Sequence, residues 1–132
     1  MDPALDVITS MPFAARCGIV LVHATKEEVR GELPFSPEIC TAGGILHGGV
    51  IMTFADTLGA MCAFLNLPPG ALTATVESKT NFFRAMRKGT ARGTSRPLHV
   101  GRTFIVVQTN VVDDDGKSIA QVTQTQAVLQ ER

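Results

Sequence analysis

Segment 43–67, GGILHGGVIMTFADTLGAMCAFLNL, limits the possible folds more than any other part of the chain. It is almost uncharged for more than twenty residues, yet it contains one histidine, His47, and one carboxylate, Asp56. A polar group that is buried without a hydrogen-bonding partner costs on the order of 2–7 kcal/mol, so Asp56 requires a compensating environment or a chemical role. From Gly48 to about Asn66 the apolar residues recur with a 3.6-residue period, which predicts a helix that LPPG then ends.

The predicted helix is apolar on nearly all sides. One broad arc carries Val50, Ile51, Phe54, Ala55, Leu58, Met61, Cys62 and Leu65, and small or uncharged residues (Met52, Gly59, Ala60 and Ala63) flank Asp56 on the other face. We expect the first face to pack on this chain's own sheet and the small-residue face to lie near something else. A membrane span is the alternative, but Asp56, Asn66 and the absence of Trp and Tyr argue against it, so we predict no membrane contact.

The rest of the chain has strand character. Strands are predicted over 19–25, 28–35, 72–83, 89–100, 102–113 and 117–129, with a loop over 36–44 and a short helical lead-in over 1–16, interrupted at Pro12. One long helix cannot cover both faces of such a sheet. We therefore predict an α+β fold of one domain, 1–132, in which an antiparallel sheet of about five to six strands wraps a long central helix.

Composition excludes several classes of function. The formal net charge is zero and 45% of the residues are hydrophobic, which excludes disorder and gives no electrostatic reason to expect nucleic acid as a partner. Cys17, Cys40 and Cys62 are odd in number and form no CxxC pair, so we interpret them as reduced thiols. Because residues 1–19 lack a basic region and a long apolar run, we expect a cytoplasmic protein.

Two candidate catalytic groups lie on this helix, one at its start and one about two turns further along. Gly48 and Gly49 follow His47 at the helix start, where free backbone N–H groups form an oxyanion hole if a ligand approaches; the alternative is a simple glycine-rich cap. Asp56 lies about 12 Å further along the helix, too far to act at the same point. Two antiparallel helices of a symmetric dimer bring Asp56 of one chain to Gly48 of the other, where an apolar setting makes the carboxylate a stronger base or nucleophile. If Asp56 is considered without the glycine pair, a buried Asp that caps a loop is the commoner explanation.

Other kinds of site are not supported by the sequence. The three histidines, His23, His47 and His99, show no HxH or HxxxH spacing, so we expect no metal. No GxxxxGK[ST], GxGxxG or GxSxG motif occurs, which removes the usual nucleotide-binding and serine-hydrolase signatures.

The run LHGGVIMTFADTLGAMCA, with an acid nine residues after the histidine, resembles the hotdog-fold acyl-CoA thioesterases, specifically the phenylacetate-degradation (PaaI-like) group. The resemblance continues through VESKTNFFRAMRKGT and GRTFIVVQTNVVDDDGKSIAQVTQTQAVL, over about the last three quarters of the chain. It implies a hotdog fold, a homodimer or a dimer of dimers, and hydrolysis of an aryl- or medium-chain acyl-CoA. It implies no cofactor other than the coenzyme A of the substrate.

The resemblance also implies roles for individual residues. The Gly48 N–H polarises the thioester carbonyl, Asp56 from the partner chain acts as general base or as nucleophile through an anhydride, His47 holds the loop, and Thr75 helps to place the water. Thr41 stands where relatives usually carry Asn, and Thr lacks the second group of the amide. That departure puts the rate and the substrate range in question.

Residues expected to bind the substrate are Gly49, Met52, Asn81, Phe82, Arg84, Arg87 and Lys88, with Phe54 and Leu58 also expected to line the acyl pocket. The three basic residues would meet the phosphates of coenzyme A, although a basic face that is merely solvated is equally expected. Two other functions stay open: a hotdog hydratase or dehydratase, and a non-catalytic acyl-CoA-binding module.

Overall fold

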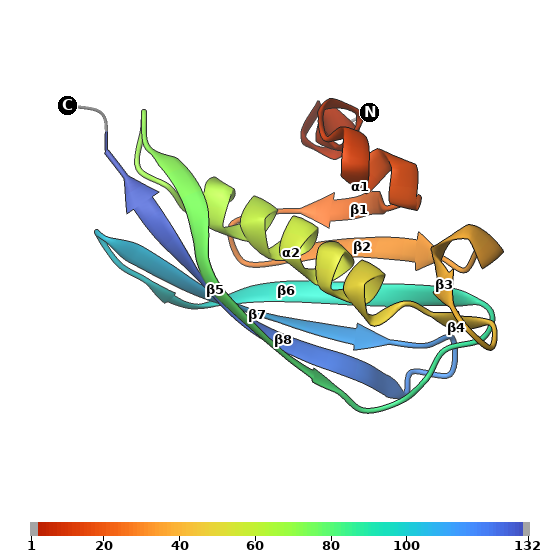
Figure 1. Ribbon diagram of the computed structural model, residues 1–132. Helices are drawn as coiled ribbons and strands as arrows, with labels where there is room; N and C mark the ends of the chain where they lie inside the picture. Colours follow the sequence, from red (N-terminus) through yellow and green to blue (C-terminus); the bar gives the residue numbers. More distant parts are fainter. Residues whose placement is uncertain (1–2, 131–132) are drawn as a thin grey trace.

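Most of the chain forms one six-stranded antiparallel sheet and the long helix α2 that the sheet wraps (Figure 1). The computed structural model describes residues 3–130. The sheet contains β1 (Val20–Ala24), β2 (Val29–Pro34), β5 (Leu72–Phe82), β6 (Thr90–Val100), β7 (Phe104–Val112) and β8 (Ser118–Leu129), in the spatial order β1-β2-β6-β7-β8-β5. Helix α2 spans Gly48–Leu65. The predicted α+β hotdog architecture is therefore confirmed.

Helix α2 lies in the concave face of the sheet and contacts β2, β5, β6, β7 and β8. Two glycines on neighbouring strands, Gly31 and Gly93, are register partners beneath it. A Cβ atom at either glycine would lie 2.6 Å from a methyl group of Leu58, so the helix approaches the sheet too closely for a side chain there. Phe54 and Leu58, both 0% exposed, fill the space that the glycines leave.

The predicted apolar arc of the helix is the buried one. Val50, Ile51, Phe54, Ala55, Leu58, Met61 and Cys62 are all buried, and Leu65 is half-buried. By length and composition α2 passes as a membrane span, but 56% of it is buried within the fold, which makes it a core helix. The small-residue face is more enclosed than expected, because Gly59 and Ala63 are also buried in the core.

Segment 36–44 differs from the predicted loop. It holds a short 3-10 helix, η2 (Pro37–Ile39), and strand β3 (Cys40–Thr41), which pairs with β4 (Ile45–Leu46) just before α2. Gly43 and Gly44 have φ of 82° and 71°, a left-handed conformation that glycine adopts without strain, and they form the turn of this hairpin. The Pro and Gly residues had predicted a loop with no strands.

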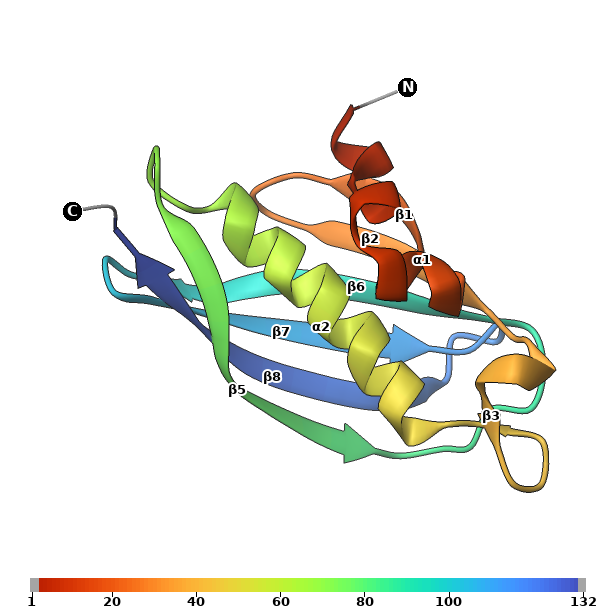
Figure 2. The same cartoon turned by 45° about the horizontal axis from the view of Figure 1, so that its top comes forward.

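Within the predicted lead-in over 1–16, residues 1–2 lie outside the described part of the chain, and Met11 separates two short helices. The 3-10 helix η1 (Pro3–Ser10) packs on β1, and α1 (Pro12–Cys17) contacts α2, beside which it lies in Figure 2. Helix α1 ends at Gly18, whose φ of 88° gives it the left-handed C-cap that glycine favours.

Candidate active site

The HGG sequence forms the start of α2. The His47 ring caps the helix, with Nδ1 accepting the Gly49 N–H at 2.8 Å, while the His47 backbone N–H donates to the Ile39 carbonyl at 3.0 Å. Leu46 N–H donates to the Met86 carbonyl at 2.9 Å, which ties the loop to the β5–β6 connection. Across residues 3–130, no acceptor bonds the Gly48 N–H, so this donor at the positive end of the helix is free.

Gly48 lies beneath an aromatic ring. A Cβ atom at this position would lie 3.3 Å from Cζ of Phe82, which is 50% exposed at the end of β5. A larger residue would push against the ring, so glycine keeps both the close packing and the access to the backbone donor. The structure thus brings together two residues that the sequence assigned to the same site.

Two potential donors lie within hydrogen-bond distance of one carboxylate oxygen of Asp56. Oδ1 lies 3.1 Å from Thr75 Oγ1 on β5 and 3.1 Å from Gln124 Nε2 on β8. In the single chain the side chain is half-buried. Hydrogen bonds from the sheet therefore compensate the carboxylate that the sequence presented as isolated.

A groove of about 420 Å³ runs along the solvent side of α2, over Asp56. Its lining is Gly49, Met52, Thr53, Asp56, Thr75 and Ser78. A second groove, of about 390 Å³, begins at the same helix start and shares Gly49 and Thr53 with the first. Its other walls are mainly apolar and include Phe13 and Cys17 of α1, Ile39 and Val50.

Two of the expected pocket residues do not line a groove. Phe54 and Leu58 are 0% exposed and point into the sheet, against Gly31 and Gly93, so this prediction was wrong. The helical period had already placed both on the arc expected to pack on the sheet, and Met52 on the other face, so the pocket assignment conflicted with that expectation. Met52, 39% exposed, is the one of the three that reaches the groove.

Two other expected residues stand apart from the groove over Asp56. Thr41 is exposed on β3, where its register partner is Ile45. Asn81 is exposed on β5 opposite Gln121. Neither lines the groove that contains Asp56.

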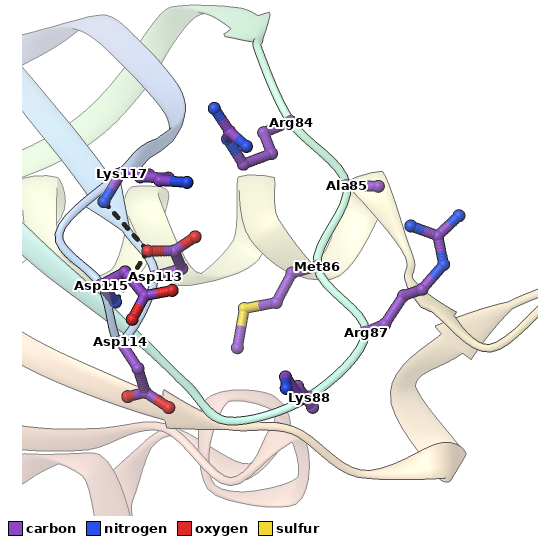
Figure 3. Close-up of a pocket in the computed structure, with 9 residues that line it drawn as sticks. All are labelled: Arg84, Ala85, Met86, Arg87, Lys88, Asp113, Asp114, Asp115 and Lys117. Atoms are coloured by element: carbon purple, nitrogen blue, oxygen red, sulfur yellow. Dashed lines mark hydrogen bonds between the residues drawn. The ribbon is translucent and has the colours of Figure 1, made fainter.

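Arg84, Arg87 and Lys88 border a separate cavity of about 550 Å³, between the β5–β6 connection and the β7–β8 turn (Figure 3). Lys117 and three aspartates of the turn complete its charged lining. One of them, Asp114, accepts a hydrogen bond from Arg92 at 2.7 Å, which lowers the pKa of the carboxyl. Among residues 3–130 no three His, Cys, Asp or Glu side chains converge as a metal site.

Sequence reasoning missed Gln124 and Gln126, which are 0% and 1% exposed in the core. The alternation of side chains along β8 would have identified them as buried. The core-facing positions of β8 alternate as Ala120, Val122, Gln124, Gln126 and Val128, so two amides occupy positions where a half-buried strand carries apolar side chains.

A long helix wrapped by an antiparallel sheet, with a free backbone donor at its start and a carboxylate two turns further on, defines a hotdog protein with a candidate acyl-transfer site. The sequence pattern of the thioesterase superfamily matches residues 43–120, more than half of the chain. The chain therefore belongs to the thioesterase superfamily.

Individual relatives agree with this assignment. A Vibrio cholerae protein, provisionally named as an esterase, is 30% identical over 114 residues, which are 86% of this chain and 76% of that protein. A thioesterase of Pseudomonas aeruginosa, solved as a mutant, superposes with a TM-score of 0.89 at 26% identity and covers 98% of this chain and 96% of its own. A Mycobacterium tuberculosis protein, also provisionally named as an esterase, gives a TM-score of 0.88 at 26% identity over 92% of this chain and 98% of its own.

Proposed function

We propose that this protein is an acyl-CoA thioesterase of the PaaI-like group, which hydrolyses an aryl- or medium-chain acyl-CoA to the free acid and coenzyme A. One observation carries the proposal: Asp56 borders an open groove that runs to a helix start with a free Gly48 N–H, in a chain of the thioesterase superfamily. Thioester hydrolysis needs both a base and a donor for the developing oxyanion, and this stretch of helix supplies the two groups.

In the proposed reaction, the Gly48 N–H binds the thioester carbonyl oxygen. Asp56 takes a proton from water as the water oxygen bonds to the carbonyl carbon, and the negative charge moves onto the carbonyl oxygen. The C–S bond then breaks, and the coenzyme A thiolate takes the proton that Asp56 holds. In the alternative course, Asp56 itself attacks, displaces the thiolate and forms an anhydride that water hydrolyses.

The two groups belong to different subunits in this proposal. Eight residues of α-helix separate Gly48 from Asp56 by about 12 Å, further than one carbonyl group spans. β5 is an edge strand of the six-stranded sheet, and Val76 near its middle is 68% exposed. The unpaired backbone groups of an edge strand favour pairing with a second copy, so we propose a homodimer. Two such dimers would form a dimer of dimers through a further face.

The grooves support the proposed substrate class. The apolar walls beside the helix start, from Phe13, Cys17, Ile39 and Val50, suit an aryl or medium aliphatic group. Arg84, Arg87 and Lys88 line the cavity beside the β7–β8 turn. There they would provide cationic partners for the phosphates of coenzyme A. We propose that the chain works as one domain in the cytoplasm, where acyl-CoA substrates occur.

A non-catalytic acyl-CoA-binding module is the second candidate, because Thr41 replaces the usual Asn and lies away from the groove over Asp56. A hydratase or dehydratase calls instead for a histidine that transfers protons. His47, which stands at the helix start, uses Nδ1 to cap the helix, which favours a structural role.

Release of thiol from a panel of acyl- and aryl-CoA thioesters separates the three candidates. We expect hydrolysis, and we expect Asp56→Asn to lower kcat by about 10²–10⁴-fold while circular dichroism and the unfolding midpoint stay close to those of the parent. Addition of water without thiol release would indicate a hydratase. Saturable binding with neither reaction would indicate a binding module, and full activity of Asp56→Asn would overturn the assigned role.

A further inference from the structure

Gln124 is the most deeply buried polar side chain in contact with Asp56. It projects from β8 toward α2, is 0% exposed, and donates from Nε2 both to Asp56 Oδ1 at 3.1 Å and to Gln126 Oε1 at 3.0 Å. A buried amide is costly unless its donors and acceptors are used. Gln124 uses both N–H groups, while its Oε1 has no hydrogen-bonding partner among residues 3–130.

The direction of this amide is set by a chain of hydrogen bonds that starts at the backbone. Thr73 Oγ1 donates to the Ala127 carbonyl at 2.8 Å, so its hydroxyl can only accept from Gln126 Nε2, at 3.1 Å. That bond turns Gln126 Oε1 toward Gln124, and the NH₂ group of Gln124 must face it. The same NH₂ group then points its second hydrogen at Asp56.

Thr75 cannot replace this donor. Its Oγ1 lies 3.1 Å from Asp56 Oδ1 and 2.6 Å from Gln126 Oε1, and both partners are acceptors. A hydroxyl carries one proton, so Thr75 serves one acceptor at a time, and the shorter contact is the one to Gln126. Gln124 has a separate hydrogen for each acceptor.

Gly59 makes room for the amide on the helix. A Cβ atom at Gly59 would lie 2.1 Å from Gln124 Oε1 and 2.5 Å from its Cδ, so no other residue fits without moving the amide. Gly59 is three residues after Asp56 on the same face of α2. The absence of a side chain there thus fits the contact between Gln124 and the carboxylate.

We propose that Gln124 is a positioning residue for Asp56: it holds Oδ1 and leaves Oδ2 as the oxygen that takes the proton of water or attacks the thioester. Within residues 3–130, no hydrogen bond reaches Oδ2, and none of the four ion pairs includes Asp56. Neutral donors therefore set the orientation of the carboxylate. This inference rests on the proposed thioesterase function.

The test compares Gln124→Met with the parent and with Thr109→Val as a matched control. Met preserves the length of the side chain and removes the amide, whereas Thr109→Val removes a buried hydrogen bond to Ser95 that does not touch Asp56. For Gln124→Met we expect kcat to fall by about 10–100-fold with KM nearly unchanged, and the acid limb of the kcat–pH profile to move to higher pH. The control keeps the parent profile.

Carbon NMR of the Asp56 carboxyl group supplies a measurement that does not depend on turnover. The titration midpoint of this carboxyl should move up in Gln124→Met and stay in place in Thr109→Val. If the parent hydrolyses no thioester, the proposed function fails, and the titration still decides the role of Gln124. An unchanged midpoint, or a kcat–pH profile equal to that of the control, overturns the positioning role.

Gly59→Ala approaches the same contact from the helix and serves where Gln124→Met does not fold. The added methyl group displaces the end of a flexible side chain, and alanine also favours the helix. We expect the same shift of the Asp56 midpoint, with an unfolding midpoint somewhat below that of the parent because the displaced amide loses its hydrogen bonds. A folded Gly59→Ala protein with an unshifted midpoint contradicts the proposal.

Discussion

At the scale of single residues, the environment of Asp56 shows why an apolar helix retains a carboxylate. Oδ1 has two potential donors at 3.1 Å, Gln124 Nε2 and Thr75 Oγ1, and the side chain is half-buried beside an open groove. Hydrogen bonds to a charged group are worth about 1.5–3 kcal/mol each, comparable to the cost of partial burial. The carboxylate is thus stabilised on one side and accessible on the other, as the proposed base or nucleophile requires.

Cys62 has the opposite environment, and a pH dependence of stability follows. It is 0% exposed, and burial raises the pKa of its thiol from 9.0 to about 11. The unfolded chain therefore loses this proton at lower pH than the folded chain. The contribution of the neutral thiol is complete below pH 9.0 and is lost as the pH rises toward about 11, with an upper bound of about 2–3 kcal/mol.

Urea unfolding between pH 8 and 10.5 measures this effect, because the chain has no tyrosine to titrate in that range. We expect the unfolding midpoint to fall with pH, and to fall less steeply in Cys62→Ala. The slope should not vanish in that variant, since burial also raises the pKa of Cys17. Equal slopes in the two proteins would contradict the assignment to Cys62.

At the scale of elements, the close packing of α2 on the sheet depends on two glycines that face each other on neighbouring strands. Gly31 on β2 and Gly93 on β6 are register partners, and both lie under Phe54 and Leu58. The helix comes close enough to the sheet to bury these two side chains completely. This packing also fixes the rotation of α2, which directs Asp56 toward β5 and β8.

Gly93→Ala tests that seat. The new Cβ would lie 2.6 Å from a Leu58 methyl group and 3.0 Å from the Phe54 ring, in a core too dense to yield easily. We expect the free energy of unfolding to fall by about 1–3 kcal/mol, measured by urea denaturation. The same substitution should cost less in a Leu58→Ala background, because the clashing methyl groups are absent. Additive losses would show that Leu58 is not the residue it strains.

At the scale of the whole molecule, one chain holds both proposed reacting groups but does not bring them together. Gly48 and Asp56 are about 12 Å apart on a rigid helix, so no rotation of side chains closes the distance. The proposed dimer forms two sites, each with Gly48 of one subunit and Asp56 of the other. Symmetry makes these two sites equivalent.

Mixed dimers of Asp56→Ala and Gly48→Pro subunits test the shared site. Proline is tolerated at the first helical position and removes the N–H, so the helix is retained while the oxyanion donor is lost. Each variant alone should be nearly inactive. After joint refolding, half of the dimers are mixed and each has one intact site, so about a quarter of the parent activity should return.

Two controls accompany that experiment. Each variant refolded alone should regain nothing, and size-exclusion chromatography should show dimers in every sample. Dimers without recovered activity would place Gly48 and Asp56 in the same subunit's site, while monomers with full activity would remove the need for a second subunit.

More of the fold than of the candidate site could be predicted from the sequence. Helical periodicity predicted α2, and runs of strand-type residues bounded by turn residues predicted the six strands of the large sheet, all to within two residues of the observed ends, because both signals are local. The hairpin β3–β4 was missed, since two-residue strands have no period. Phe54 and Leu58 were wrongly assigned to the pocket, although the helical period had placed both on the arc that packs on the sheet.

The sequence by itself determined the order of the elements, the free helix start at Gly48 and the carboxylate two turns further on, because these depend on residues near one another in the chain. Only the tertiary structure decided what surrounds Asp56. Gln124 is 68 residues away along the chain, and its amide reaches the carboxylate only because β8 and α2 pack face to face at Gly59. Contacts over such separations depend on the register of the sheet and the rotation of the helix, which no local pattern encodes.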